Sequence, residues 1–308
     1  MEKRAFGNTG LEVTPLGFGG APIGMLDTEE SRTDQILNLL LDSGVNLIDT
    51  AASYYGSEEL IGKTVGHRRD EYILVSKCGG KFDEFDDPAW SPALITKTID
   101  RSLQRLKTDR LDVMLLHTCD LETLEKGDAL AALVKARDAG KIRFPGYSGD
   151  NETVAYAATL EDVKVIQTSI NITDQVNIDG LLPGAREKNI GVMVKRPIAN
   201  AAWKKLSDQQ GMYKDYAKTY TERLQKMNLN PADLEFDGEP DDVWPEIALR
   251  FTISQPGVHV AIIGTTNPDN TRANIAAAKK GPLPGEVVTK IRDAFKVANS
   301  DGSWVAQG

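Results

Sequence analysis

The chain has 308 residues, of which 41% are hydrophobic and 26% are charged, and its formal net charge at pH 7 is −9. This composition is typical of a globular protein with a sizeable core, and the negative charge argues against nucleic acid or an anionic membrane as a partner, since both require a basic face. No apolar run approaches the ~18 residues of a membrane span, and the N-terminus has no apolar leader. Two cysteines, Cys78 and Cys119, are too few for a disulfide framework, so we expect a cytoplasmic protein.

Eight short apolar runs recur along the chain, and each is followed by a segment with helical periodicity. The runs are LGFGG (16–20), VNLIDT (45–50), YILVSK (72–77), LDVMLLH (111–117), IRFPGYSG (142–149), VKVIQTSI (163–170), GVMVKRP (191–197) and VHVAIIG (258–264). The helical segments are 31–44, 57–65, 91–106, 127–140, 151–160, 179–189, 241–255 and 267–280. Nearly continuous apolar runs indicate strands that are buried on both faces, and repeated strand–helix units predict parallel pairing.

Eight strand–helix units predict a closed (β/α)8 barrel, or TIM barrel, as one domain over residues 1–308. An open, doubly wound sheet is the alternative, but no GxGxxG follows the first run. Residues 3–17 read as a hairpin with its turn at Asn8, Thr9 and Gly10, which we expect to cap the bottom of the barrel. Residues 198–240 are polar and read as a long irregular insertion after the seventh strand. Insertions of this length usually fold over a site or are partly mobile.

Ionisable side chains follow three consecutive strands of this predicted barrel. Asp49, Lys77 and His117 each come directly after an apolar run. Each has a simple structural explanation by itself: the aspartate as a turn cap, the lysine as a strand-end side chain reaching solvent, and the histidine as a hydrogen-bonded core residue. Because chemistry in such barrels lies at the C-terminal ends of the strands, their shared position favours a common functional site.

The segment after the second strand carries a family resemblance. Residues 49–58 read Asp-Thr-Ala-Ala-Ser-Tyr-Tyr-Gly-Ser-Glu, which resembles the pattern Asp-Thr-Ala-x-x-Tyr-Gly-x-Ser-Glu of the aldo-keto reductase family. The register places the family's catalytic tyrosine on Tyr54, and Tyr55 replaces the glycine that usually follows. The family's lysine matches Lys77 in ILVSK and its histidine matches His117 in DVMLLH. The resemblance covers nearly the whole chain and implies a catalytic set of Asp49, Tyr54, Lys77 and His117.

The resemblance implies reduction of an aldehyde or ketone to an alcohol, with a nicotinamide supplying the hydride and the protein supplying the proton. A tyrosine with a pKa of about 10 is a weak acid near neutral pH. We therefore expect Lys77 to lower the pKa of Tyr54, Asp49 to hold the ammonium, and His117 to donate to the substrate oxygen or orient it.

The same resemblance implies a binding site for NADP(H). Ser148 and Gln167 match the family's carboxamide-binding positions, and five residues match its segment for the adenosine phosphate and adenine: Gly264, Thr265, Thr266, Asn270 and Asn274. Strand-end positions complete the expected cofactor site, namely Gly20, Ala21, Asp49, Lys195, Arg196, Pro197 and Ile198.

Three departures from the family pattern bear on the cofactor. Gly149 stands where an asparagine is common, and Lys195, followed by Arg196, stands where a ring often stacks on the nicotinamide. Asn270 replaces a common basic residue, although Arg272 lies close in the sequence. We therefore expect only a modest preference for NADPH over NADH, and leave open which of Lys195 and Arg196 faces the nicotinamide.

Three other functions would use some of the same residues. A regulatory subunit that senses nicotinamide nucleotides with little turnover is the main alternative, and a Schiff-base lyase acting through Lys77 is a second. A metal enzyme is disfavoured because the chain has three histidines, and His67 and His259 lie away from the strand ends. The expected partner is a small carbonyl or alcohol, and the oligomeric state stays open. Expected pocket residues are Ile23, Met25, Tyr55, Phe82, Phe85 and Trp90.

Overall fold

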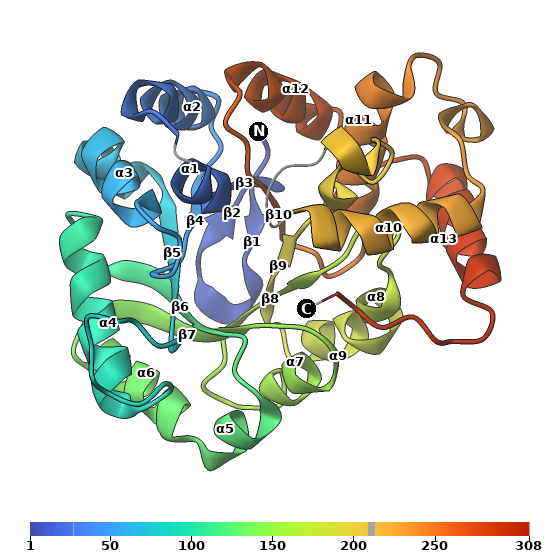
Figure 1. The fold of residues 1–308 in the computed structure, drawn as a ribbon. Coiled ribbons are helices and arrows are strands. Elements are labelled where there is room, and N and C mark those ends of the chain that lie inside the picture. Colours follow the sequence, from blue (N-terminus) through green and yellow to red (C-terminus); the bar gives the residue numbers. More distant parts are fainter. Residues whose placement is uncertain (27, 209–212, 308) are drawn as a thin grey trace.

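Eight parallel strands form a closed barrel in the computed structural model, which describes residues 1–26, 28–208 and 213–307 (Figure 1). In barrel order the strands are β3 (Leu16–Gly19), β4 (Leu47–Asp49), β5 (Ile73–Cys78), β6 (Leu111–His117), β7 (Ile142–Ser148), β8 (Val165–Ser169), β9 (Gly191–Lys195) and β10 (Val260–Ile263). Parallel pairing of β10 with β3 closes the barrel. The predicted (β/α)8 fold is confirmed, and each predicted apolar run coincides with one strand, although β5 extends one residue past its run, to Cys78.

Helices surround the barrel (Figure 1). They are α1 (Ala21–Met25), α2 (Glu30–Asp42), α3 (Ser57–Thr64), α4 (Pro92–Arg105), α5 (Leu121–Lys126), α6 (Asp128–Asp138), α7 (Asn151–Ala157), α8 (Val176–Gly180), α9 (Leu182–Glu187), α10 (Tyr213–Met227), α11 (Pro240–Ile253), α12 (Pro268–Lys279) and α13 (Gly285–Ala298). Local chemistry sets their ends: at the start of α4 the Ser91 hydroxyl accepts a hydrogen bond from the N–H of Leu94, and Pro92 occupies the first turn. None of the described helices has both the length and the apolar character needed to cross a membrane.

An N-terminal hairpin closes the bottom of the barrel, as predicted. Its strands are β1 (Arg4–Ala5) and β2 (Glu12–Val13), paired antiparallel. Phe6 is fully buried among the inward-facing side chains of the barrel. Gly7 packs directly on the start of β9 with φ 55°, and a Cβ there would lie 2.3 Å from the Gly191 nitrogen. Because the hairpin fills this end, the barrel opens only at the other, where the C-terminal ends of the strands lie.

The insertion after β9 departs from the prediction. Residues 198–240 were expected to be irregular, but they contain α10, a 15-residue helix. This helix buries Ala217, Tyr220, Leu224 and Met227, whose spacing of three or four residues gives one apolar face. Short 3-10 turns flank it at Ala199–Ala201, Leu206–Asp208 and Pro231–Leu234. The prediction also missed α1, α5 and α13.

Candidate active site

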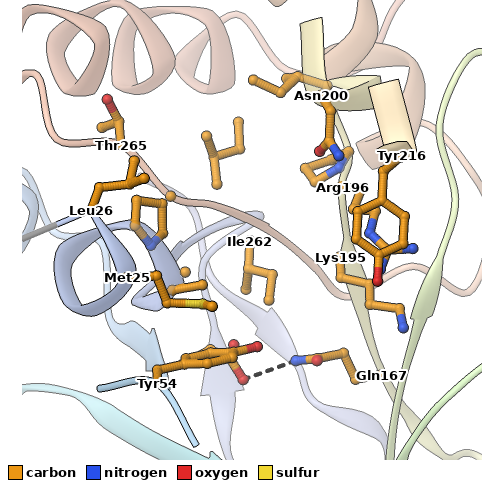
Figure 2. Close-up of a pocket in the computed structure, with 18 of the residues that line it drawn as sticks. Met25, Leu26, Tyr54, Gln167, Lys195, Arg196, Asn200, Tyr216, Ile262 and Thr265 are labelled. Atoms are coloured by element: carbon orange, nitrogen blue, oxygen red, sulfur yellow. Dashed lines mark hydrogen bonds between the residues drawn. The ribbon is translucent and has the colours of Figure 1, made fainter. Parts of the chain in front are cut away.

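A cavity of about 740 Å³ opens at the C-terminal ends of the strands (Figure 2). This volume lies within the range of ligand and cofactor sites. Most of the predicted site residues line it, namely Ala21, Asp49, Tyr54, His117, Ser148, Gln167, Lys195, Arg196, Pro197, Ile198, Gly264, Thr265 and Thr266. The strand ends thus bring together residues from across the chain, as the barrel fold requires.

Four predicted residues lie outside the cavity wall. Lys77 is buried directly behind Asp49. The N–H of Gly20 donates to the Asp49 carbonyl at 2.7 Å, so this glycine ties β3 to β4. Asn270 is exposed on α12 and its amide donates to the Thr265 hydroxyl at 3.3 Å, while Asn274 borders a small void beside β3 and β10. Gly20, Asn270 and Asn274 therefore lie at the edge of the site and support it.

A buried ion pair anchors the catalytic end of the cavity. The Lys77 ammonium donates to Asp49 Oδ2 at 2.7 Å and to the Thr50 carbonyl at 2.8 Å, and both ion-pair partners are almost fully buried. The ammonium lies 5.0 Å from the centre of the Tyr54 ring. The His117 ring packs edge-on against Tyr54, with ring centres 5.9 Å apart. The four predicted catalytic residues therefore converge on one place.

Of the two adjacent tyrosines, only Tyr54 faces the cavity (Figure 2). The turn that presents it is tied down by backbone hydrogen bonds, including Ala52 N–H to the Lys77 carbonyl at 3.1 Å. Gly56 adopts a left-handed conformation, with φ 74°, and begins α3. Tyr55 is 83% exposed and points away. The turn geometry thus selects the tyrosine that the motif register predicts.

Burial sets the ionisation states of this cluster. Burial raises the pKa of Tyr54 and the nearby Lys77 ammonium lowers it, as expected, but burial has the larger effect, so the net shift is upward. Burial lowers the pKa of His117 to about 3, with Lys77 and Lys195 adding to the effect, so the imidazole is neutral at physiological pH. Burial also acts to lower the pKa of Lys77, but attraction to Asp49 and Tyr54 gives a net rise, and the lysine stays an ammonium.

The two predicted carboxamide-binding residues are connected to the ion pair. Ser148 donates to Gln167 Oε1 at 3.1 Å, and Gln167 Nε2 donates to Asp49 Oδ1 at 2.8 Å (Figure 2). This chain of hydrogen bonds fixes the orientation of the Gln167 amide and uses the second oxygen of Asp49. The sequence did not predict the link between Gln167 and Asp49, which joins strands far apart in the chain.

Lys195 and Arg196 take different directions from the end of β9. The Lys195 ammonium pairs with Asp150 Oδ2 at 2.9 Å. The Arg196 guanidinium stacks 3.8 Å from the centre of the Tyr216 ring and also donates to the Gln307 carbonyl. Asp150, Tyr216 and Gln307 were all missed by the sequence analysis. Tyr216 belongs to α10, whose helical periodicity offered a signal for its position.

The expected substrate pocket needs correction. Met25 lines the cavity as predicted, but five other expected residues do not: Ile23, Tyr55, Phe82, Phe85 and Trp90. Ile23 is fully buried in the core and Trp90 packs against the core under Gly79. Phe82 and Phe85 pack on the Arg101 guanidinium, with ring centres at 4.0 Å and 5.2 Å. Apolar side chains that line the cavity instead include Pro22, Leu26, Ile262 and Tyr216.

The remaining candidate groups have structural surroundings. Cys78 and Cys119 are free thiols, both buried, and burial raises the pKa of each. His259 accepts a hydrogen bond from the Val192 N–H at 3.0 Å through Nδ1, which ties β10 to β9. Within the described part of the chain, no three metal-ligating side chains gather at one point.

Comparisons with known proteins agree with this geometry. The aldo/keto reductase family model matches residues 15–296. L-galactose dehydrogenase from Arabidopsis thaliana is 27% identical over 293 residues, covering 90% of this chain and 88% of the relative. The NADH-specific methylglyoxal reductase of Escherichia coli is 26% identical, covering 90% and 93%. The holo structure of aldo-keto reductase AKR11C1 from Bacillus halodurans superposes with a TM-score of 0.80 at 26% identity and covers 96% of both chains. The chain therefore belongs to the aldo/keto reductase family of nicotinamide-dependent oxidoreductases.

Proposed function

We propose that this protein reduces a small aldehyde or ketone to the alcohol with NADPH, and that Tyr54 is the general acid. One observation carries the proposal: Tyr54 enters the cavity beside the Lys77–Asp49 ion pair and a neutral His117. A protonated phenol next to a fixed ammonium is suited to give up a proton and to be stabilised as a phenolate. The two free, buried thiols are consistent with a reducing cytoplasm.

The residues of the cavity fit a nicotinamide dinucleotide. Ser148 and Gln167 offer hydroxyl and amide groups at the catalytic end, which match the hydrogen-bonding needs of a carboxamide. The cavity then extends to residues 264–266, which lead into α12. Backbone N–H groups at a helix start favour an anion such as a phosphate. Gly264 is needed there, because a Cβ would lie 2.4 Å from the Gly19 carbonyl oxygen.

The residues have distinct roles in the proposed reaction. When bound, the reduced nicotinamide supplies a hydride to the carbonyl carbon. Tyr54 donates its hydroxyl proton to the carbonyl oxygen, and Lys77 stabilises the phenolate that remains. The Ser53 hydroxyl lies 3.5 Å from His117 Nδ1, and when it donates there, Nε2 holds the ring proton and can donate to the same oxygen. Positioned proton transfer of this kind contributes about 10²–10⁴-fold to a rate.

The burial of Lys77 argues against the Schiff-base alternative. Its side chain is fully buried and its ammonium is held by Asp49 and Thr50. The net rise in its pKa keeps it charged, whereas a nucleophilic lysine must be neutral and reachable. Lys77 is therefore proposed as an electrostatic partner of Tyr54.

Substitution of each adjacent tyrosine tests the assignment. Tyr54→Phe removes the acid and should lower kcat for NADPH-dependent aldehyde reduction by about 10²–10⁴-fold. Its affinity for NADPH, measured by fluorescence titration, should change little, because the ring is kept. Tyr55→Phe is the matched control and should keep most of the rate, since Tyr55 points to solvent. Equal losses in both variants, or a loss in Tyr55→Phe alone, would refute the role of Tyr54.

A further inference from the structure

A second buried ion pair lies at the catalytic end of the cavity, beside the one formed by Lys77 and Asp49. Lys195 lines the cavity and Asp150 supports it from behind, because their side chains are 15% and 1% exposed. Asp150 is itself fixed, since its Oδ1 accepts hydrogen bonds from the Thr168 hydroxyl and the Ser169 N–H, both at 2.8 Å. Lys195 therefore contributes to the cavity wall, and the Asp150 carboxylate lies behind it.

The strand register places Lys195 close to the reacting end. On β9, Met193 points into the barrel interior, and Lys195 is the next residue on the same face, one step nearer the opening. Met193 is paired in register with Gln167, so Lys195 enters the cavity just above the Gln167 amide (Figure 2). Its charge also reaches the catalytic residues, since it contributes to the lowered pKa of His117. Any ring held by Ser148 and Gln167 and within reach of Tyr54 must lie near this ammonium.

We propose that Lys195 makes the site bind the reduced nicotinamide more tightly than the oxidised one. The inference rests on the proposed function. Loss of a hydride turns a neutral dihydronicotinamide ring into a cation, and a fixed ammonium beside the ring repels the cation but not the neutral form. Burial lowers the pKa of Lys195, and Arg196 and Lys77 add to this effect, whereas the ion pair with Asp150 opposes it and favours the ammonium. The Asp49 carboxylate, which also lines the cavity, is paired with Lys77.

The size of the effect follows from charge and distance. At about 7 Å and an effective permittivity of about 20, an unopposed like charge would weaken binding of the cation about 50-fold. The Asp150 carboxylate behind Lys195 cancels a large part of this repulsion. We therefore expect discrimination by about threefold to tenfold in the ratio of dissociation constants. A reductase with this property is inhibited less by its oxidised cofactor than one that binds the oxidised and reduced forms equally well.

Equilibrium binding of NADPH and NADP⁺ to the full-length protein tests the proposal without relying on turnover. Calorimetry would give, for wild type and variants, the ratio of the dissociation constant of NADP⁺ to that of NADPH. Lys195→Met removes the charge but keeps a side chain of similar length. The ratio should fall by about threefold to tenfold, because no ammonium then repels the oxidised ring. Lys195→Arg keeps the charge and should keep the ratio.

Asp150→Asn provides a control of opposite sign. It removes the compensating carboxylate but keeps an acceptor for Thr168 and Ser169, so the ratio should rise above the wild-type value at a pH at which Lys195 keeps its proton. Because Asp150 also raises the pKa of Lys195, the ratio is measured from neutral pH downward. The double variant Asp150→Asn/Lys195→Met leaves no unpaired buried charge, so it can be measured even if Lys195→Met alone fails to fold. Its ratio of dissociation constants should equal that of Lys195→Met. An unchanged ratio in the variants lacking Lys195, or a shift in the same direction in both single variants at every pH measured, overturns the inference. Absence of binding of either nucleotide to wild type would instead refute the proposed function itself, and the inference with it.

Discussion

At the scale of single residues, Tyr54 and His117 determine how the protein should respond to pH. Burial raises the pKa of Tyr54 above its ordinary value, against the opposing effect of Lys77. Burial lowers the pKa of His117 to about 3, with help from the two lysines. A general acid works only while it carries its proton, and Tyr54 keeps its proton at every pH below its raised pKa. The neutral form of His117 persists at every pH well above 3.

These two shifts predict a flat pH profile for reduction. With saturating NADPH, kcat/KM should stay within about twofold from about pH 5 to about pH 9. Raising the pH should lower the rate only beyond the ordinary tyrosine value of about 10, as Tyr54 loses its proton. Steady-state kinetics in overlapping buffers would measure the profile, with His117→Asn as a control whose plateau should have the same width. An inflection near pH 6–7 that disappears in His117→Asn would show that the histidine titrates, contrary to this prediction.

Whether a site residue could be predicted from the sequence depends on how far along the chain its contacting residues lie. Asp49, Lys77 and His117 lie at the ends of apolar strands, so their convergence followed from the barrel, whereas Tyr54 was assigned by its register in the motif at 49–58. Asp150 and Gln307 contact the cavity wall through an ion pair and a hydrogen bond between distant segments, which no local pattern encodes. The position of Tyr216 is signalled only by the helical periodicity of α10. The sign of the Tyr54 pKa shift depends on a balance between burial and one nearby charge, and burial could be judged only in the folded chain.

At the scale of secondary structure, buried strands were easier to predict than amphipathic helices. Each strand is an unbroken apolar run between polar segments, because both of its faces are covered. In contrast, α10 is strongly charged, and its buried positions are spread over 11 residues from 217 to 227. α13 likewise buries Val287, Ile291 and Phe295 at helical spacing, which a search for period alone would find. α1 has five residues, including Pro22 and Gly24, and gives no such signal.

The start of α12 is the element that bears on cofactor preference. Arg272 lies on its exposed side and pairs with Asp269 at 2.9 Å. We expect NADPH to bind modestly better than NADH, because the Thr265 and Thr266 hydroxyls and this one guanidinium can contact a 2′-phosphate. A charge-assisted contact of about 1.5 kcal/mol corresponds to about tenfold in affinity. Arg272→Ala should reduce the preference by weakening NADPH more than NADH in fluorescence titrations.

Asp269→Asn is the matched control for this element. It removes the ion-pair partner of Arg272 without touching the arginine, so NADPH binding should become stronger or stay the same, and NADH binding should not change. If NADH binds the wild-type protein as well as NADPH does, the 2′-phosphate argument fails. The segment from 264 to 274 would then serve only the adenosine and the pyrophosphate.

At the scale of the whole molecule, the C-terminal segment 304–307 connects parts of the fold that are distant in sequence. It runs from the end of α13 back to the barrel opening (Figure 1), where the Gln307 carbonyl accepts hydrogen bonds from Ser169 of β8 and from Arg196, which follows β9. Along this path Arg223 of α10 donates to the Val305 carbonyl at 2.7 Å, and Asn151 at the start of α7 exchanges two hydrogen bonds with Ala306, both 3.0 Å. The Gln307 carbonyl finally accepts from Arg196 at the cavity wall. The segment therefore holds the insertion and one wall of the cavity against the barrel.

Trp304 anchors this segment, and its removal should loosen more than the segment itself. Its ring packs edge-on against Phe295 at 5.2 Å and under the Arg223 guanidinium at 5.0 Å. Trp304→Ala should lower the free energy of unfolding by about 2–3 kcal/mol, less than for a fully buried tryptophan because Trp304 is only half-buried. Val305→Ala is the control and should change stability by less than about 0.5 kcal/mol, since Val305 is 58% exposed. Urea unfolding would measure both, and hydrogen exchange should show faster exchange in α10 for Trp304→Ala alone. If exchange in α10 is unchanged while the segment itself is released, then α10 is held by its own apolar face, and the C-terminal segment plays no part in closing the cavity.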